Sequence, residues 1–254
     1  MGPESIRITV VTPCLNSRET IRDNVESVIS QSYPAHHVII DGVSTDGTLD
    51  VIRKCCAENT TIVSEPDHCE FDAMNKGVAL ADGDVINILN SDDFYAHEDV
   101  LAKVAEVFQD PKIDCCYGDL VYVDRTDTDK VVRLWKSGPY DPKRFLRGWM
   151  PPHPTFFIRR EIYRKYGYYR LDLPFAADYE LMLRYMFKHR ITVAYIPEVL
   201  VRMRTGGKAN ITLRHRLAAH KSAKKAWTDN GLKPKPWTLP FKPLSKITQY
   251  FVRS

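Results

Sequence analysis

Residues 83–93, with the sequence GDVINILNSDD, decide the fold of this chain. Aliphatic and β-branched residues end abruptly there in polar side chains and two adjacent carboxylates. This pattern is typical of a buried parallel strand that carries an acidic pair at its carboxyl end, where open α/β sheets bind ligands. The two carboxylates repel each other, so a shared hard cation such as Mg²⁺ or Mn²⁺ would suit them. A helix cap formed by Ser91 or Asp92 is the alternative, and this stretch alone favours neither reading.

Strand and helix patterns alternate before this stretch. Short apolar runs predict strands, and each is followed by an apolar stripe with helical spacing. Four such alternations within the first hundred residues predict a doubly wound, mostly parallel sheet with right-handed crossovers and helices on both faces. The expected strands and helices before residue 83 are 6–11, 19–31, 37–40, 49–57, 61–64 and 71–81.

Acidic residues follow the expected strands at the same edge of the sheet. The segment DGVSTDGT occupies residues 41–48, and turn chemistry explains Gly47 and Asp46 but does not require Asp41. Asp72 lies in the first turn of the helix at 71–81, where the helix dipole favours a carboxylate. These acids are therefore expected near Asp92 and Asp93.

The organisation changes after about residue 112. Following a helix at 97–109, residues 114–123 and 130–135 alternate in polarity, which favours an antiparallel hairpin. Further strand-like runs are expected later in the chain, and a helix is expected to begin near Asp178. The later strands are expected at 156–158, 191–195 and 199–203.

Composition bounds the class of protein. The chain has 254 residues, of which 44% are hydrophobic and 27% charged, as in ordinary globular proteins. No apolar run approaches the ~20 residues of a membrane span, and the N-terminus lacks a signal-peptide pattern, so a cytoplasmic location is expected. The cysteines are expected to be reduced, because adjacent pairs suit neither a disulfide framework nor a zinc site. They are Cys14, Cys55, Cys56, Cys69, Cys115 and Cys116.

Positive charge is concentrated at the end of the chain. Residues 202–254 contain thirteen Lys or Arg and one acid, a net charge of +12 in a chain of +4, which leaves −8 for the rest. A helix is expected at 209–229, followed by a basic and aromatic segment. Such a tail favours either an anionic membrane surface or a helix packed on the body with its cations outward, with equal weight. Nucleic acid is not expected as a partner, because no recognised nucleic-acid-binding fold is present.

Five motifs in order resemble the family 2 inverting glycosyltransferases with the GT-A fold, over about residues 6–205. They are TPCLN, DGVSTDGT, EPDHCEFDAMNKG, GDVINILNSDD and AADYELMLR. The resemblance implies a Rossmann-like, mostly parallel sheet with a smaller antiparallel element and a C-terminal helical tail. It also implies a nucleotide-sugar-binding half at 1–111, an acceptor-binding and catalytic half of the same domain at 112–205, and a basic extension at 206–254.

The resemblance implies a role for several of these residues. Asp41 would read the base of a UDP-linked donor, Asp92 would face the ribose, and Asp93 would bind an Mn²⁺ or Mg²⁺ ion at the diphosphate. Asp178 would be the catalytic base, which agrees with the need to remove a proton from an acceptor hydroxyl of very high pKa. The implied donor-binding residues are Thr12, Pro13, Asn16, Asp41, Asp72, Asn75, Lys76 and Asp92.

Other residues are weaker candidates. Many family members carry an arginine where this chain has Met74, and Lys76 is the expected substitute. His153, set among prolines and aromatic residues, and Glu180 are candidates for acceptor contact. Arg204 and Lys208 flank a glycine pair that would form a mobile basic loop near the donor phosphates.

The sequence therefore predicts a metal-dependent hexosyl- or N-acetylhexosaminyltransferase that builds surface polysaccharides. Its acceptor would be a hydroxyl of a glycan or of a polyprenyl-linked saccharide, and the enzyme would be cytoplasmic or peripheral on the inner face of the membrane. A nucleotidyltransferase is one alternative, although no glycine- and arginine-rich triphosphate loop follows the first strand. A non-catalytic nucleotide-sugar or glycan-binding module is the other.

Overall fold

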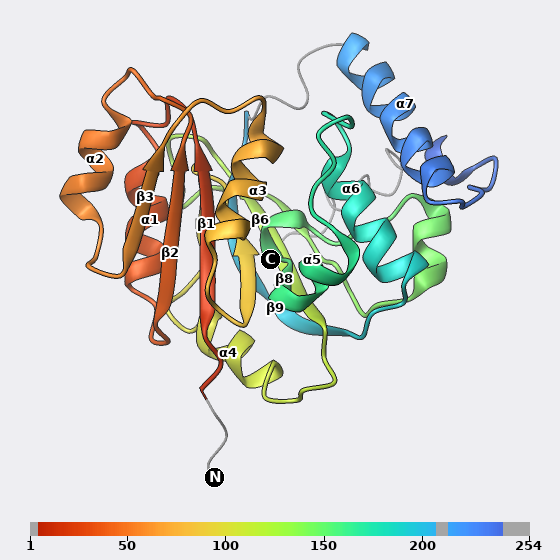
Figure 1. Ribbon diagram of the computed structural model, residues 1–254, viewed down its shortest axis with the longest axis horizontal. Coiled ribbons are helices and arrows are strands. Elements are labelled where there is room, and N and C mark those ends of the chain that lie inside the picture. Colours follow the sequence, from red (N-terminus) through yellow and green to blue (C-terminus); the bar gives the residue numbers. More distant parts are fainter. Residues whose placement is uncertain (1–4, 207–212, 241–254) are drawn as a thin grey trace.

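The first half of the chain forms alternating strands and helices, as the sequence predicts. The computed structural model describes residues 5–206 and 213–240. Strand β1 pairs in parallel with β2 and β4, and β2 pairs in parallel with β3, which confirms the predicted parallel sheet (Figure 1). The elements of this half are β1 Ile8–Cys14, α1 Ile21–Ile29, β2 Ala35–Asp41, α2 Thr48–Cys55, β3 Thr60–Ser64, α3 Glu70–Leu80 and β4 Val85–Ile88.

The second half extends the same sheet with mixed strand directions. The described residues form a nine-stranded sheet of order β3-β2-β1-β4-β8-β6-β9-β5, with β7 paired to β6. The remaining elements are β5 Asp93–Tyr95, α4 Val100–Val107, β6 Cys115–Val123, β7 Val131–Trp135, η1 Pro142–Arg147, η2 His153–Thr155, β8 Phe157–Arg159, α5 Arg160–Tyr166, α6 Ala177–Met182, η3 Leu183–Lys188, β9 Val193–Arg204 and α7 Leu213–Asp229.

Strand β8 joins the two halves. It lies between β4 and β6 and pairs antiparallel with both. The predicted hairpin is confirmed, because β6 and β7 pair antiparallel with an irregular register beside Tyr122. The sheet is therefore continuous across residue 112, and the second half of the chain is built directly onto the parallel half.

Three details differ from the sequence prediction. Residues expected as two strands at 191–195 and 199–203 form one strand, β9, which runs parallel to β6. Its register shifts beside Gly118, where a Cβ would collide with Leu200. Asp93 is expected at a strand end, but it begins a separate short strand, β5, which pairs antiparallel with β9. Helix α5 is absent from the sequence prediction.

Helices cover both faces of the parallel half. Helix α3 packs on one face against β1 and β2, so closely that a Cβ on Gly77 would collide with Val11. Helices α1 and α4 contribute to the apolar cluster on the opposite face, where Val28 and Leu101 are buried with Val10. The short distance between α3 and β1 fixes the position of the loop that precedes α3.

Helix α7 packs against α6 (Figure 1). Its Ala223, Ala226 and Trp227 are buried, whereas Lys221 and Lys224 are exposed. The Trp227 indole Nε1 donates a hydrogen bond of 2.9 Å to the Tyr179 hydroxyl. Within 213–229 the packed-helix interpretation is therefore confirmed, and residues 241–254 lie outside the described part of the chain.

Two general expectations concern the whole chain. All six cysteines are free thiols, as predicted. Across residues 5–206 and 213–240, no helix combines the length and the apolar character needed to cross a membrane.

Candidate active site

The registers of the parallel strands bring their carboxyl ends to one edge. Cys14 of β1 lies opposite Asp41 of β2, and Asp41 lies opposite Ser64 of β3. The loops that follow β1 and β4 touch directly, because the hydroxyls of Ser17 and Ser91 are 2.8 Å apart. The acids predicted at this edge therefore come from neighbouring loops.

Asp41 is fully buried at the end of β2. Its Oδ2 accepts hydrogen bonds from the Ser64 hydroxyl at 2.7 Å and from the backbone N–H of Ser44 at 3.1 Å. The Cys14 thiol donates to Oδ1 at 3.7 Å, and burial together with the charge of Asp41 raises the pKa of that thiol. A carboxylate offers about four lone-pair positions, so Asp41 keeps acceptor capacity for a ligand N–H.

The other predicted residues of the first loop support this arrangement. Thr12 is buried, and its hydroxyl is hydrogen-bonded to Asn24 at 3.2 Å and to the His37 ring at 2.9 Å. Pro13 is buried within β1, whereas Asn16 is exposed and adopts a left-handed backbone with φ of 52°. The Asn16 side chain accepts from the backbone N–H of Thr45 at 3.0 Å, which ties the loop after β1 to the loop after β2.

Asp92 and Asp93 occupy different environments although they are adjacent. Asp93 has no exposed surface, and its Oδ2 accepts from the Asn90 amide at 3.1 Å, whereas its buried Oδ1 has no partner among the described residues. Burial, followed by the charge of Asp92, raises the pKa of Asp93 well above its usual range, and Asn90 and Arg204 oppose that shift. Asp92 is half-buried, and its carboxylate has no hydrogen-bond partner within the described part of the chain.

Residues 90–93, which contain Asp92 and Asp93, form an acidic turn after β4. Two side chains that are distant in sequence hold its backbone. The Asn24 amide of α1 donates to the carbonyls of Asn90 at 2.9 Å and Asp93 at 3.0 Å. The Arg204 guanidinium of β9 donates to the carbonyl of Asp92 at 3.0 Å and pairs with Asp23. The backbone of the acidic turn is thus held by side chains from α1 and from β9.

Asp178 and His153, both from the second half of the chain, lie near each other. Asp178 is half-buried in the first turn of α6, as predicted, and its Oδ1 accepts from the N–H of Tyr179 at 2.7 Å. The His153 Nε2 lies 2.8 Å from the Tyr169 hydroxyl. Burial lowers the pKa of His153, and the nearby charge of Asp178 opposes this shift.

The segment that contains His153 lies beside the strand that leads to Asp92. The Asn87 amide of β4 donates to the carbonyls of Pro154 at 3.0 Å and Phe156 at 3.1 Å. Since Asn87 precedes Asn90 by three residues, the acidic turn and the His153 segment are held to the same end of β4. The end of β4 therefore brings the segment that contains His153 beside the acidic turn, and Asp178 lies close enough to His153 for its charge to act on that ring.

Residues 9–167 match the family model described as glycosyl transferase family 2. The chain belongs to that family. A glycosyltransferase of Mycobacterium tuberculosis strain H37Rv, Rv1514c, is 31% identical over 183 residues, which cover 70% of this chain and 68% of the relative. Its name assigns no substrate.

Solved structures share the fold of this glycosyltransferase. The mannosyltransferase PcManGT of Pyrobaculum calidifontis, in complex with GDP-Man and Mn²⁺, aligns with a TM-score of 0.65 and 18% identity over 98% of this chain and 76% of that chain. S. aureus TarS 1-349, in complex with UDP-GlcNAc, aligns with a TM-score of 0.66 and 15% identity over 88% of this chain and 66% of that chain. The predicted GT-A fold class is therefore confirmed.

The predicted donor residues on α3 of the glycosyltransferase are engaged with other protein groups. The Lys76 ammonium contacts Asp67 at 2.7 Å and Glu65 at 2.9 Å, and its hydrogen bonds to these two carboxylates raise the pKa of Lys76. Asp72 accepts from the backbone N–H and the ring Nδ1 of His68. Lys76 and Asp72 therefore shape the loop before α3, and their contact with a donor stays a prediction.

Glu180 is not part of the candidate active site of the glycosyltransferase. Its side chain is 1% exposed, and its two oxygens accept from Arg184 at 2.9 and 3.0 Å and from the Asn230 amide at 2.8 Å. The structure thus contradicts the expected acceptor contact, because Glu180 points into the packing between α6 and the segment after α7. The helical period turns Glu180 away from the direction of Asp178.

Arg204 also differs from its predicted role. It was expected on a mobile loop, but it lies in β9 with 4% of its surface exposed, and its guanidinium is held by Asp23 and by two carbonyls. Lys208, the other residue of the predicted loop, lies outside the described residues. No local pattern in the sequence indicates the contacts of Arg204, because its partners are distant along the chain.

The acidic turn of the glycosyltransferase fits a divalent cation. Within residues 5–206 and 213–240, no group of three or more His, Cys, Asp or Glu side chains could hold a metal ion. Mg²⁺ at phosphate-transferring sites is commonly held by one or two carboxylates together with substrate phosphates. Asp92, with its unpartnered carboxylate, and Asp93, with its orphaned buried Oδ1, supply such a pair of hard oxygen donors.

Proposed function

We propose that this glycosyltransferase moves a hexosyl or N-acetylhexosaminyl group from a nucleoside-diphosphate sugar to a hydroxyl of a glycan or polyprenyl-linked acceptor, with inversion at the anomeric carbon. A UDP-linked donor is the expected form. The observation that carries the proposal is the acidic turn at the end of β4, beside which the Asn87 amide holds the segment that contains His153. The charge of Asp178 acts on His153 and so connects Asp178 with this segment. The UDP-GlcNAc complex of TarS and the GDP-Man complex of PcManGT support a nucleotide-sugar donor.

In this mechanism Asp178 takes the proton of the acceptor hydroxyl. The hydroxyl oxygen attacks the anomeric carbon as the bond between that carbon and the diphosphate oxygen breaks. The electron pair of the breaking bond leaves with the nucleoside diphosphate, and attack from the opposite side inverts the configuration. Asp178 suits this role because its Oδ2 keeps acceptor capacity while Oδ1 is held by the N–H of Tyr179.

Asp92 and Asp93 would hold the Mn²⁺ or Mg²⁺ ion. When bound, such an ion stabilises the negative charge that develops on the departing diphosphate. Since Asp93 is fully buried and Asp92 is half-buried, we assign the more exposed contact to Asp92 and a supporting contact to Oδ1 of Asp93. This assignment gives Asp92 a contact with the metal ion instead of the expected contact with the ribose. The Mn²⁺ complex of PcManGT supports the presence of a divalent ion.

The nucleoside would lie over the loops after β1 and β2. Asp41 has lone pairs left for a base N–H, and the bond between Asn16 and Thr45 fixes the two loops beside it. Thr12 and Pro13 line this region from within β1 and would act by shape rather than by polar contact, because the Thr12 hydroxyl is already hydrogen-bonded.

A donor panel tests the proposed function. The full chain is incubated with Mn²⁺ or Mg²⁺ and a panel of UDP-, GDP- and dTDP-linked sugars, and nucleoside diphosphate release is measured with and without saccharide acceptors. Acceptor-dependent release with one donor class is expected, and NMR of the product should show the inverted anomeric configuration. Pyrophosphate release from a nucleoside triphosphate would instead indicate a nucleotidyltransferase, and donor binding without turnover would indicate a binding module.

We also propose that the segment after α7 contacts an anionic membrane surface on the cytoplasmic side. Trp237 is 49% exposed and lies close in sequence to the exposed Lys233 and Lys235. Tryptophan and lysine together favour the interface of an anionic bilayer, and each basic residue near the surface contributes about 1 kcal/mol. Such a contact would bring the enzyme to a polyprenyl-linked acceptor.

Vesicle flotation tests this membrane proposal. The variant Trp237→Ala, Lys233→Glu, Lys235→Glu should bind vesicles that contain phosphatidylglycerol at least tenfold more weakly than the wild type, and neither should bind phosphatidylcholine vesicles. The control Arg53→Glu, Lys54→Glu reverses two exposed charges on α2 and should bind as the wild type does. Equal binding of the wild type and the Trp237 variant would exclude this segment as the membrane contact.

A further inference from the structure

Tyr169 links the helix at the donor side to the histidine at the acceptor side. The Asn75 amide of α3 donates to the carbonyl of Tyr169 at 2.9 Å, and its Oδ1 accepts from the N–H of Tyr169 at 2.9 Å. Both polar atoms of the Asn75 side chain are therefore used on one backbone residue 94 positions away. This contact gives Asn75 a role within the fold, and its predicted contact with the donor stays a prediction.

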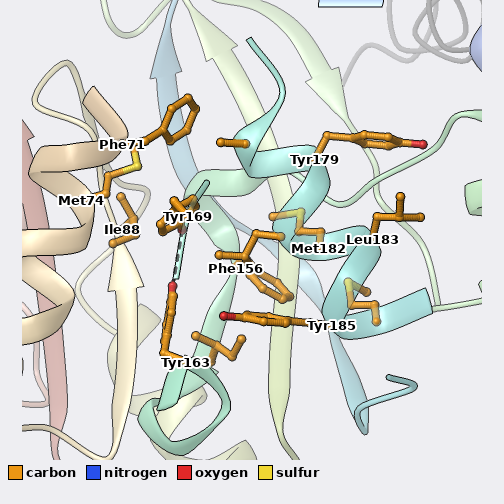
Figure 2. Packing of buried hydrophobic residues seen from close by; sticks show 14 of the residues in the cluster. Phe71, Met74, Ile88, Phe156, Tyr163, Tyr169, Tyr179, Met182, Leu183 and Tyr185 are labelled. Atoms are coloured by element: carbon orange, nitrogen blue, oxygen red, sulfur yellow. Dashed lines mark hydrogen bonds between the residues drawn. The ribbon is translucent and has the colours of Figure 1, made fainter. Parts of the chain in front are cut away.

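The side chain of Tyr169 continues the link toward His153. Its ring stacks on Phe71 of α3 at a centroid distance of 5.8 Å and meets the His153 ring edge-on at 5.6 Å. Figure 2 shows Tyr169 beside Phe71 and Met74 of α3, with a hydrogen bond toward Tyr163. The Tyr169 hydroxyl lies 2.8 Å from the His153 Nε2 and 3.4 Å from the Tyr163 hydroxyl, and only 4% of the residue is exposed.

The protonation of this pair follows from its burial. Burial raises the pKa of Tyr169 and lowers the pKa of His153, so a neutral phenol faces a neutral imidazole. The phenol O–H donates to the unprotonated Nε2, which places the ring proton of His153 on Nδ1. That Nδ1 has no partner among the described residues, so its N–H is left for a ligand beside Asp178.

We propose that Tyr169 is a positioning residue for the transfer reaction: held by Asn75, it orients His153 so that its Nδ1–H donates to an oxygen of the acceptor saccharide next to Asp178. This inference rests on the proposed function. The chain of contacts couples α3, which borders the donor loops, to the group that holds the acceptor. Tyr169 itself does not touch the reacting atoms.

Tyr169→Phe tests the inference, because it removes the hydroxyl and keeps the ring that packs on Phe71. The variant should lower kcat/KM for the acceptor about tenfold, mainly through a higher acceptor KM, with an unchanged donor KM and a Tm within about 5 °C of the wild type. Tyr163→Phe is the matched control. It removes the neighbouring buried hydroxyl, which does not contact His153, and should leave both KM values unchanged.

A double-mutant cycle separates positioning from a general loss of packing. If Tyr169 acts through His153, the variant that combines Tyr169→Phe with His153→Ala should be no less active than His153→Ala alone. Multiplicative losses in the double variant would show that Tyr169 acts independently of His153 and would overturn the inference. A decrease in the donor affinity of Tyr169→Phe, measured by calorimetry, would also overturn it.

The tautomer gives a readout that does not depend on turnover. In protein labelled with ¹⁵N-histidine, the His153 signals, identified by their absence in His153→Ala, should show a protonated Nδ1 and a hydrogen-bonded, unprotonated Nε2. Tyr169→Phe should shift the Nε2 signal, whereas Tyr163→Phe should not. A protonated Nε2 in the wild type would refute the role of Tyr169 as a positioning residue. Absence of any glycosyl transfer would refute the proposed function, but it would not alter this spectrum.

Discussion

Asp178→Asn is expected to lower kcat about 10³-fold while the Kd for the nucleotide-sugar donor stays unchanged, because a general base contributes about 10² to 10⁴ in rate. Asparagine has nearly the same shape and keeps a side-chain oxygen for the N–H of Tyr179, so the first turn of α6 is preserved. It cannot accept the proton of the acceptor hydroxyl. The loss should therefore fall on the chemical step.

Steady-state kinetics and calorimetry check this prediction together. The matched control is Asp172→Asn, which removes an acid paired with Arg170 and Lys225 on the surface near α7 and should retain full turnover. A Tm for Asp178→Asn close to that of the wild type would show that the active site remains folded. Turnover of Asp178→Asn above one tenth of the wild-type value would remove Asp178 from the role of base.

The parallel half of the fold followed from the sequence because its signals are local. Each strand there is a short apolar run, and β1, β2 and β3 are each followed within a few residues by a helix. Pattern and spacing therefore predict a parallel sheet, although they do not give the order of its strands. The second half depends on pairings between distant segments. Strand β8 inserts between β4 and β6 about seventy residues after β4, and no local pattern indicates that position.

The two strands expected at 191–195 and 199–203 form the single strand β9, which includes Pro197 although proline removes a donor from the ladder. In the structure β9 runs through Pro197, and its pairing with β6 is irregular in the same region, between the partners of Tyr117 and Asp119. The irregular register accommodates the proline in one continuous strand.

The candidate site also contains residues that local sequence patterns locate and contacts that only the folded chain creates. Asp41, Asp92 and Asp178 could be placed from the sequence, because a strand end or a helix start locates each of them. The contacts of Asn75 and Arg204 could not, since they join residues 94 and 112 positions apart in the chain. Glu180 was misjudged because its buried partner Asn230 becomes a neighbour only when the chain after α7 packs onto α6, whereas Arg184 is a local partner at the i,i+4 spacing.

Asp92→Asn and Asp93→Asn should each lower Mn²⁺-dependent activity by more than about 10²-fold, because a metal ion supplies several kcal/mol of stabilisation to the charge of the leaving diphosphate. Their effects on stability should differ. Asp93→Asn removes a buried carboxyl whose Oδ1 has no partner and whose neighbour is another carboxylate. Without metal at pH 7, this variant should be more stable than the wild type by about 1 kcal/mol or more.

The pH dependence of that difference follows from the direction of the pKa shift. Burial and the charge of Asp92 raise the pKa of Asp93, so the folded state keeps its proton to higher pH than the unfolded state does. The free energy of unfolding of the wild type is therefore undiminished below about pH 4 and decreases as the pH rises toward the raised folded pKa. Asp93→Asn lacks this decrease, so its stability advantage should grow above about pH 4.

Urea unfolding from pH 4 to pH 8, with EDTA or with Mn²⁺, measures both effects. Mn²⁺ binds only the folded protein in the proposed model, so it should raise the stability of the wild type and reverse the advantage of Asp93→Asn. Asp92→Asn should not respond to Mn²⁺, and it should weaken the pH dependence because the charge next to Asp93 is gone. Asp99→Asn, which replaces an acid outside the acidic turn, should behave as the wild type does toward Mn²⁺. An equal Mn²⁺ response in the wild type and in both variants of the acidic turn would place any metal ion elsewhere in the molecule, and Asp93 would then be a buried structural acid.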